Sequence, residues 1–179
     1  MKNQTKEMIA EAFKQLLRKQ NFREITVTEI CEAVGCQRRT FYYHFDDKYQ
    51  LAAWIYTQTM NTVWDPNYGP YDFRENYIAG LIAIQKDTDL YRKVLPDDAL
   101  SGLYKHIVQY GDTMFEERIR KNHPEVAVDE NLRFMIHYSN QAQICVIREW
   151  LFSPHPEEAS SLVAKILEAF PERLRGLLL

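Results

Sequence analysis

Glycine and proline are scarce in this chain of 179 residues, with 6 and 7 copies. Few tight turns are therefore expected, which favours long helices. Signals for strands are almost absent, because no alternating run of β-branched residues is longer than Ile25–Thr28. With 46% hydrophobic and 26% charged residues, the chain should fold as a soluble globule. These features together predict an all-α protein.

Cysteine is also sparse, and the three copies, Cys31, Cys36 and Cys145, form no CxxC pair. An odd number without such spacing predicts reduced thiols in small buried or turn positions of a cytoplasmic protein. The sequence shows no basic-then-apolar leader, and no apolar run approaches the ~18 residues that a membrane span needs. We therefore expect no membrane partner.

Motifs for catalysis and cofactor binding are missing as well. The five histidines do not pair with acids or cysteines at the spacing of metal ligands. The sequence contains no glycine-rich phosphate loop, no HExxH and no GxSxG. We therefore expect neither an enzyme nor a metal or other cofactor site.

Charge is distributed unevenly along the chain, although the formal net charge is only −3. Residues 1–48 carry 9 Lys/Arg against 7 Asp/Glu, a net of +2, whereas residues 49–179 carry 13 against 18, a net of −5. A mildly basic head on an acidic body is typical of a protein with a small DNA contact patch. We expect two domains with these bounds, a head at 1–48 and a body at 49–179.

The head contains the pattern of two short helices around a tight turn. Thr26 and Glu29 form the S/T-x-x-E capping box that begins a helix. Gly35 is the residue type that most easily takes the left-handed conformation at a helix end. This order of helix, turn and helix predicts a helix-turn-helix.

The helix after the turn should begin near Gln37 or Arg38. Phe41 and Phe45 are four residues apart, so both should point into a small core. No acidic residue occurs from Gln37 to Phe45, while two arginines, two tyrosines and a histidine do. That composition is typical of a helix that lies against nucleic acid.

Apolar periodicity predicts the remaining helices. The expected ranges are 5–20, about 47–64, 71–86, 88–95, 97–121 with Leu100 inward, 129–152, and one from about 157 that Pro171 breaks, leaving a short tail. The dense cluster of helix breakers at 65–70 marks a boundary between head and body, so the helix at 47–64 should connect the two.

Four short stretches of the head resemble the DNA-binding signature of the TetR/AcrR family of bacterial transcriptional regulators. They are Thr26-Val27-x-x-Ile30, Ala33-Val34-Gly35, Thr40-Phe41-Tyr42-x-His44-Phe45 and Lys48-x-x-Leu51. The resemblance covers residues 5–52 and implies a three-helix DNA-binding head joined by a fourth helix to a helical dimerisation and effector domain. The body looks like a short C-terminal type, similar to regulators of dihydroxyacetone kinase operons, on the residues Arg148-Glu149-Trp150-Leu151, Ser153-Pro154 and Glu157-Glu158.

The resemblance and the side-chain chemistry assign two kinds of DNA contact. Phosphate contacts are expected from Thr26, Thr28, Thr40, Tyr42, His44 and Lys48. Base contacts are expected from Gln37, Arg38, Arg39 and Tyr43, because a guanidinium can hold guanine through two hydrogen bonds.

Each of these roles has a plainer alternative. Thr26 could serve only as a cap, Tyr42 and His44 could pack within the head, and Lys48 could be a solvated lysine. The arginines could be an exposed basic pair. The family usually has serine where this chain has Gln37, and often glycine where it has Arg39. The operator sequence should therefore differ from those of related proteins.

Two sites are predicted in the body. The helix at 129–152 is apolar nearly all round, so a second subunit should cover one side of it, unless it is simply the core helix of a monomer. The expected dimer residues are Ile144, Ile147, Leu151, Leu162 and Ile166. Polar and aromatic groups on apolar helices could orient a small effector, or could be ordinary satisfied side chains; they are Tyr77, Tyr104, Tyr110, His137, Tyr138 and Gln141.

Gly111 is unusual inside a long helix, where it could admit a ligand or a close helix crossing. The sequence thus predicts a ligand-responsive repressor that binds a palindromic double-stranded DNA operator as a homodimer. The alternative is a co-regulator that acts through protein contacts and has little DNA affinity of its own.

Overall fold

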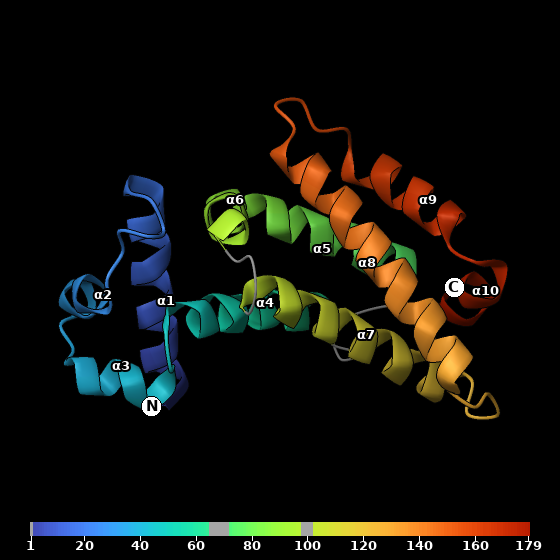
Figure 1. Ribbon diagram of the computed structural model, residues 1–179, viewed down its shortest axis with the longest axis horizontal. Coiled ribbons are helices and arrows are strands. Elements are labelled where there is room, and N and C mark those ends of the chain that lie inside the picture. The colour runs from blue at the N-terminus through green and yellow to red at the C-terminus, as the bar shows by residue number, and fades with distance from the viewer. Residues whose placement is uncertain (1, 65–71, 98–101) are drawn as a thin grey trace. The chain divides into compact units, whose positions relative to one another are not determined.

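The computed structural model describes residues 2–64, 72–97 and 102–179, and the regular elements in these ranges are all helical (Figure 1). The all-α prediction is therefore confirmed. The elements are α1 (Lys2–Lys19), α2 (Val27–Val34), α3 (Arg38–His44), α4 (Lys48–Trp64), α5 (Phe73–Lys86), α6 (Thr88–Val94), the short 3₁₀ helix η1 (Leu95–Asp97), α7 (Leu103–Asn122), α8 (Glu130–Phe152), α9 (Ala159–Ala169) and α10 (Glu172–Leu178).

Local signals explain why the helices begin and end close to the predicted residues. The carboxylate of Asp47 accepts a hydrogen bond from the backbone N–H of Gln50 at 2.7 Å, which caps the start of α4. Asp129 caps α8 in the same way, because its carboxylate accepts a hydrogen bond from the backbone N–H of Leu132 at 2.8 Å. Pro171 separates α9 from α10, and the predicted short tail is itself a helix.

Two predictions fall outside the described residues. One is the head–body boundary at 65–70, and the other is the beginning of the predicted helix at 97–121, including Leu100. Within the described part of the chain, α7 begins at Leu103 and continues one residue beyond the predicted end.

The chain forms two compact units. Unit 1 consists of Met1–Gln58 and Asp87–Lys105, and unit 2 of Thr59–Lys86 and His106–Leu179. In unit 1, α1 packs against α2 and also against α6, which periodicity alone did not reveal. An ion pair between Lys14 and Asp87 and a hydrogen bond from Lys93 to the carbonyl of Leu17 hold α6 on α1. The functional division at residue 48 stays a prediction.

Unit 2 is built around buried aromatic rings. The rings of Phe73 and Phe115 lie 5.6 Å apart between centroids, and those of Phe115 and Phe170 lie 6.0 Å apart, both edge to face. Arg118, only 4% exposed, donates from Nε to the carbonyl of Leu178 at 2.8 Å and so ties α7 to α10. None of the described helices is long and apolar enough to cross a membrane.

Candidate nucleic-acid interface

The start of α2 carries the predicted capping box. The Thr26 hydroxyl accepts from the Glu29 N–H at 3.2 Å, and the Glu29 carboxylate accepts from the Thr26 N–H at 2.8 Å. The hydroxyl also donates to the same carboxylate at 2.8 Å. Thr26 is therefore the cap that the sequence predicted, while Thr28, in the first turn, is exposed.

The turn between α2 and α3 depends on Gly35, whose φ of 73° is in the left-handed region. Its N–H donates to the carbonyl of Glu32 at 3.2 Å, and the N–H of Cys36 donates to the carbonyl of Cys31 at 2.9 Å. These two bonds make a Schellman motif, which ends α2 and fixes where α3 begins. A side chain at position 35 would be strained in this conformation.

The helix α3 buries one face and exposes the other. Phe41 and Phe45 are 0% and 2% exposed, as predicted, and their ring centroids lie 5.7 Å apart. On the opposite side, Tyr42 is 48% and Tyr43 65% exposed. Two adjacent aromatic side chains with about half or more of their surface exposed mark a surface available to a partner.

The arginines at the start of α3 are both exposed. Arg38 donates to the Tyr42 hydroxyl at 3.4 Å, and its guanidinium carbon lies 5.8 Å from the centre of that ring. This hydrogen bond raises the pKa of Arg38. Gln37 precedes α3, and its side chain makes no capping hydrogen bond.

Lys48 makes three hydrogen bonds to the backbone within unit 1. Its ammonium donates to the carbonyls of Phe22, Arg23 and Ile25 at 2.6, 3.1 and 2.9 Å. Because an ammonium has three N–H donors, these bonds compete with a phosphate contact. Lys48 therefore positions the loop between α1 and α2, which the sequence did not reveal because the three carbonyls lie more than twenty residues away. Its phosphate contact stays a prediction.

The ten predicted DNA-contact residues all lie on one continuous segment of unit 1. Thr40 and His44 are half-buried on α3, and the ring of His44 lies 5.0 Å from that of Tyr43. The exposed members are Thr26, Thr28, Gln37, Arg38, Arg39, Tyr42 and Tyr43. The structure thus presents most of the predicted residues to solvent, and their individual roles on DNA remain predictions.

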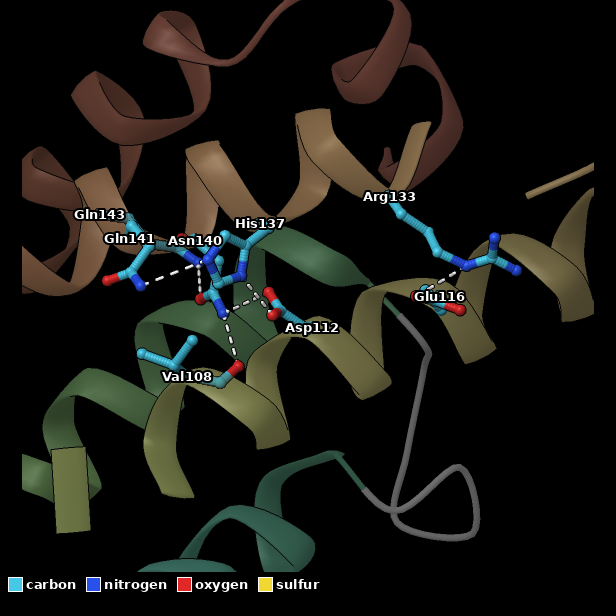
Figure 2. Close-up of polar contacts among 8 residues, drawn as sticks. All are labelled: Val108, Asp112, Glu116, Arg133, His137, Asn140, Gln141 and Gln143. Carbon is cyan, nitrogen blue, oxygen red and sulfur yellow. Dashed lines mark hydrogen bonds and ion pairs between the residues drawn. The ribbon is translucent and has the colours of Figure 1, made fainter. Parts of the chain in front are cut away.

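A polar network between α7 and α8 lies in unit 2 (Figure 2). The amide of Asn140, 1% exposed, donates to the carbonyl of Val108 at 2.8 Å and to the carboxylate of Asp112 at 2.9 Å. The other oxygen of that carboxylate lies 2.7 Å from Nδ1 of His137. The amide nitrogen of Gln141 lies 3.4 Å from the remaining ring nitrogen of His137.

The network continues towards α5 through Gln143, whose amide donates to Asn140 at 2.8 Å. The hydroxyl of Tyr77 donates to Gln143, and burial raises the pKa of Tyr77, so this phenol keeps its proton. Gly111 allows the close approach of Asn140, because a Cβ at position 111 would lie 2.6 Å from the amide atoms. A close helix crossing therefore explains this glycine.

The predicted ligand residues divide into two groups. Three of them, Tyr77, His137 and Gln141, belong to the polar network. The sequence could suggest these only as separate polar residues, and it did not suggest Asp112. Tyr110 instead donates to Asn61, Tyr138 is 64% exposed, and Tyr104 belongs to unit 1. The structure does not gather all six at one place, and effector binding stays a prediction.

The predicted dimer residues lie mostly inside the chain. Leu151, Leu162 and Ile166 are 4%, 3% and 6% exposed, while Ile144 and Ile147 are half-buried. The helix α8 is not apolar nearly all round, because its Asn140 and Gln143 are buried polar groups. A different, exposed row follows α8 at three-, four- and seven-residue spacing, and we name it the α8 stripe: Phe134, Tyr138, Ala142, Cys145 and Phe152.

A known protein family matches the N-terminal part of this chain. The family described as bacterial regulatory proteins, tetR family, matches residues 9–54. The HTH-type dhaKLM operon transcriptional activator DhaS of Lactococcus lactis subsp. lactis (strain IL1403) is 26% identical over 94 residues, 52% of this chain and 50% of that protein. The match therefore spans about half the length of this curated relative.

Solved structures match almost the whole chain in fold. A dihydroxyacetone kinase operon activator, DhaS, has a TM-score of 0.69 at 19% identity and covers 97% of this chain and 96% of its own. A putative transcriptional regulator from Pseudomonas aeruginosa PAO1 has a TM-score of 0.59 at 15% identity, with 98% and 92% covered. At such identities the likeness describes the fold.

Proposed function

We propose, from the match of residues 9–54 to the tetR family of bacterial regulatory proteins, that this chain binds a palindromic DNA operator as a homodimer to regulate transcription. One observation carries the proposal: α3 exposes arginine and tyrosine side chains on a face backed by the buried rings of Phe41 and Phe45. Regulation of transcription, and not catalysis, is the activity of the family.

The two contact types follow from where the side chains lie. Arg38 and Arg39 stand at the first turn of α3, where a recognition helix meets base edges in the major groove. Thr26 and Thr28 stand at the start of α2, where the N–H groups of Val27 and Thr28 in the first turn have no acceptor within the helix and suit a phosphate. We propose that the arginines select the sequence and that the threonines hold the backbone.

Substitution of Arg39 tests the proposal. We expect Arg39→Ala to lower the discrimination between the upstream DNA of the gene and a scrambled site by roughly 1–3 kcal/mol, because a bidentate base contact is lost. Arg173→Ala is the matched control, since Arg173 is an exposed arginine of α10 in unit 2. Full discrimination by Arg39→Ala, measured by fluorescence anisotropy, would contradict the assignment.

Salt dependence separates this proposal from the alternative of a co-regulator. Phosphate contacts release counterions, so affinity should fall roughly a hundredfold or more between about 50 and 200 mM salt. A protein that acts through other proteins would show no specific shift of its upstream DNA at the lower salt concentration. That result would overturn the proposed function.

For the second subunit we propose the α8 stripe as the contact surface, in place of the residues first expected. Phe134 and Tyr138 are 70% and 64% exposed, and their rings stack with centroids 6.3 Å apart. Phe152, at the far end of the stripe, is 40% exposed. A two-fold pairing through this face would present two copies of α3, and operator half-sites about 34–36 Å apart would match them.

For the direction of regulation we propose repression, by occupation of the operator. Activation is a second candidate, because the relative that matches in sequence is an operon transcriptional activator. A reporter fused to the upstream DNA distinguishes them. Deleting the gene raises expression under repression and lowers it under activation.

We also propose a small-molecule effector that acts on unit 2 by competing for the hydrogen bonds of the polar network. Tyr77 and His137 are predicted ligand residues that the network joins through Asn140. Candidate compounds should change operator affinity in the native protein and have a weaker effect in Asn140→Ala. If no compound that stabilises the protein changes operator affinity, this part of the proposal fails.

A further inference from the structure

Two of the three cysteines meet at the turn of the helix-turn-helix. Cys31 lies in α2 and Cys36 follows Gly35, so the two residues are the ends of the Schellman motif that the bond from Cys36 N–H to Cys31 carbonyl closes at 2.9 Å. In this motif the side chains at those two positions frequently touch. Here both positions carry thiols.

The two thiols differ in access to solvent. Cys31 is 3% exposed, whereas Cys36 is half-exposed. Burial and the neighbouring Cys36 thiol raise the pKa of Cys31 to about 11, so the inner thiol keeps its proton at neutral pH. An oxidant from solvent therefore reaches Cys36 first, with Cys31 in place as its reaction partner.

We propose that Cys31 and Cys36 are a peroxide-sensitive dithiol that closes to an intramolecular disulfide and so controls the recognition helix. The Cys36 sulfur attacks hydrogen peroxide, takes one oxygen to become a sulfenic acid, and releases water. The Cys31 sulfur then attacks the sulfenic sulfur, and the hydroxyl leaves with the Cys31 proton as a second water. Two electrons pass from the sulfurs to the peroxide.

The consequence for the head follows from bond lengths. A disulfide of about 2.05 Å is much shorter than a contact between two thiols, so oxidation draws Cys36 towards α2. Cys36 is followed directly by Gln37 and by Arg38, the first residue of α3. A shift there displaces the proposed base-reading side chains, and this part of the inference depends on the proposed function.

Thiol chemistry is tested first, without DNA. The Cys145→Ser background removes the exposed third thiol of α8, leaving only the pair. After brief treatment with hydrogen peroxide, we expect the intact mass to fall by two hydrogen atoms, titratable thiols to fall from two to none, and dithiothreitol to reverse both changes. A gain of oxygen atoms without that loss would overturn the dithiol.

Controls in the same background keep the result interpretable. Cys36→Ser should have the same melting temperature as the Cys145→Ser protein, and its mass should not fall by two hydrogen atoms after treatment with peroxide. Cys31→Ala, checked for folding by circular dichroism, should not lose two hydrogen atoms either. If either single-thiol variant still lost two hydrogen atoms, the bond would have to form elsewhere and the assignment would be wrong.

DNA binding is then measured with the reduced and oxidised native protein, because Cys145 belongs to the α8 stripe that we propose as the dimer contact. We expect oxidation to weaken operator binding by about tenfold or more, the cost of losing one base contact, and dithiothreitol to restore it. Cys36→Ser should bind equally with and without peroxide. Equal affinities of the reduced and disulfide forms would overturn the proposal that the disulfide controls α3. Failure of the reduced protein to bind would instead overturn the proposed function. The mass measurement would then still show whether Cys31 and Cys36 form a disulfide.

Discussion

The ammonium of Lys48 satisfies three backbone carbonyls of the loop after α1, those of Phe22, Arg23 and Ile25. It also lies 4.3 Å from the centre of the Phe22 ring. Lys48→Met keeps the apolar stem and removes the charge, so we expect unit 1 to lose roughly 2–4 kcal/mol of stability. Lys19→Met, an exposed lysine of α1, is the control, and equal urea midpoints for both variants would contradict this role.

Glu29 provides a prediction about pH. The backbone N–H and hydroxyl of Thr26, with Gln20, lower the pKa of Glu29 below its ordinary value of 4.5. A lowered pKa in the folded state stabilises the head above pH 4.5, and this contribution is lost as the pH falls through the folded pKa. We therefore expect the difference in stability between the native protein and Glu29→Gln to become smaller as the pH falls. A difference in melting temperature that is the same at pH 7 and pH 3.5 would contradict this.

At the scale of helices, the crossing of α7 and α8 depends on one glycine. Helix propensity alone would make Gly111→Ala stabilising by about 1 kcal/mol. Because the new Cβ would lie 2.6 Å from the buried Asn140 amide, we expect a net loss of roughly 1–3 kcal/mol instead. Gly176→Ala in α10 meets no atom within 4 Å and should be neutral or stabilising, as thermal unfolding of the two variants will show.

Helix bounds were predictable because their signals are local. Thr26 and Gly35 act on backbone groups a few residues away, so their roles could be derived from spacing alone, and the caps of Asp47 and Asp129 are equally local. The packing of α6 on α1 and the contacts of Lys48 join residues far apart in sequence. No periodicity in a single sequence encodes such pairs, and the DNA-contact segment was predictable only because it is short and continuous.

At the scale of the whole molecule, the α8 stripe should decide the oligomeric state. We expect Tyr138→Glu to give a monomer in sedimentation, because a charge would be buried without a partner at the proposed two-fold contact. Met8→Glu is the control, since Met8 is a 49% exposed apolar residue of unit 1. A native protein that sediments as a monomer at micromolar concentration would contradict the homodimer itself.

The contact between Gly111 and Asn140 also limits which substitutions can be accepted at these two positions during evolution. A larger residue at position 111 would meet the amide atoms at 2.6 Å, so it becomes tolerable only after position 140 has shortened. Loss of the Asn140 amide first, however, leaves the Val108 carbonyl and the Gln143 amide without their partner. Descendants should therefore change the two positions together, and relatives that keep a long side chain at 140 should keep glycine at 111.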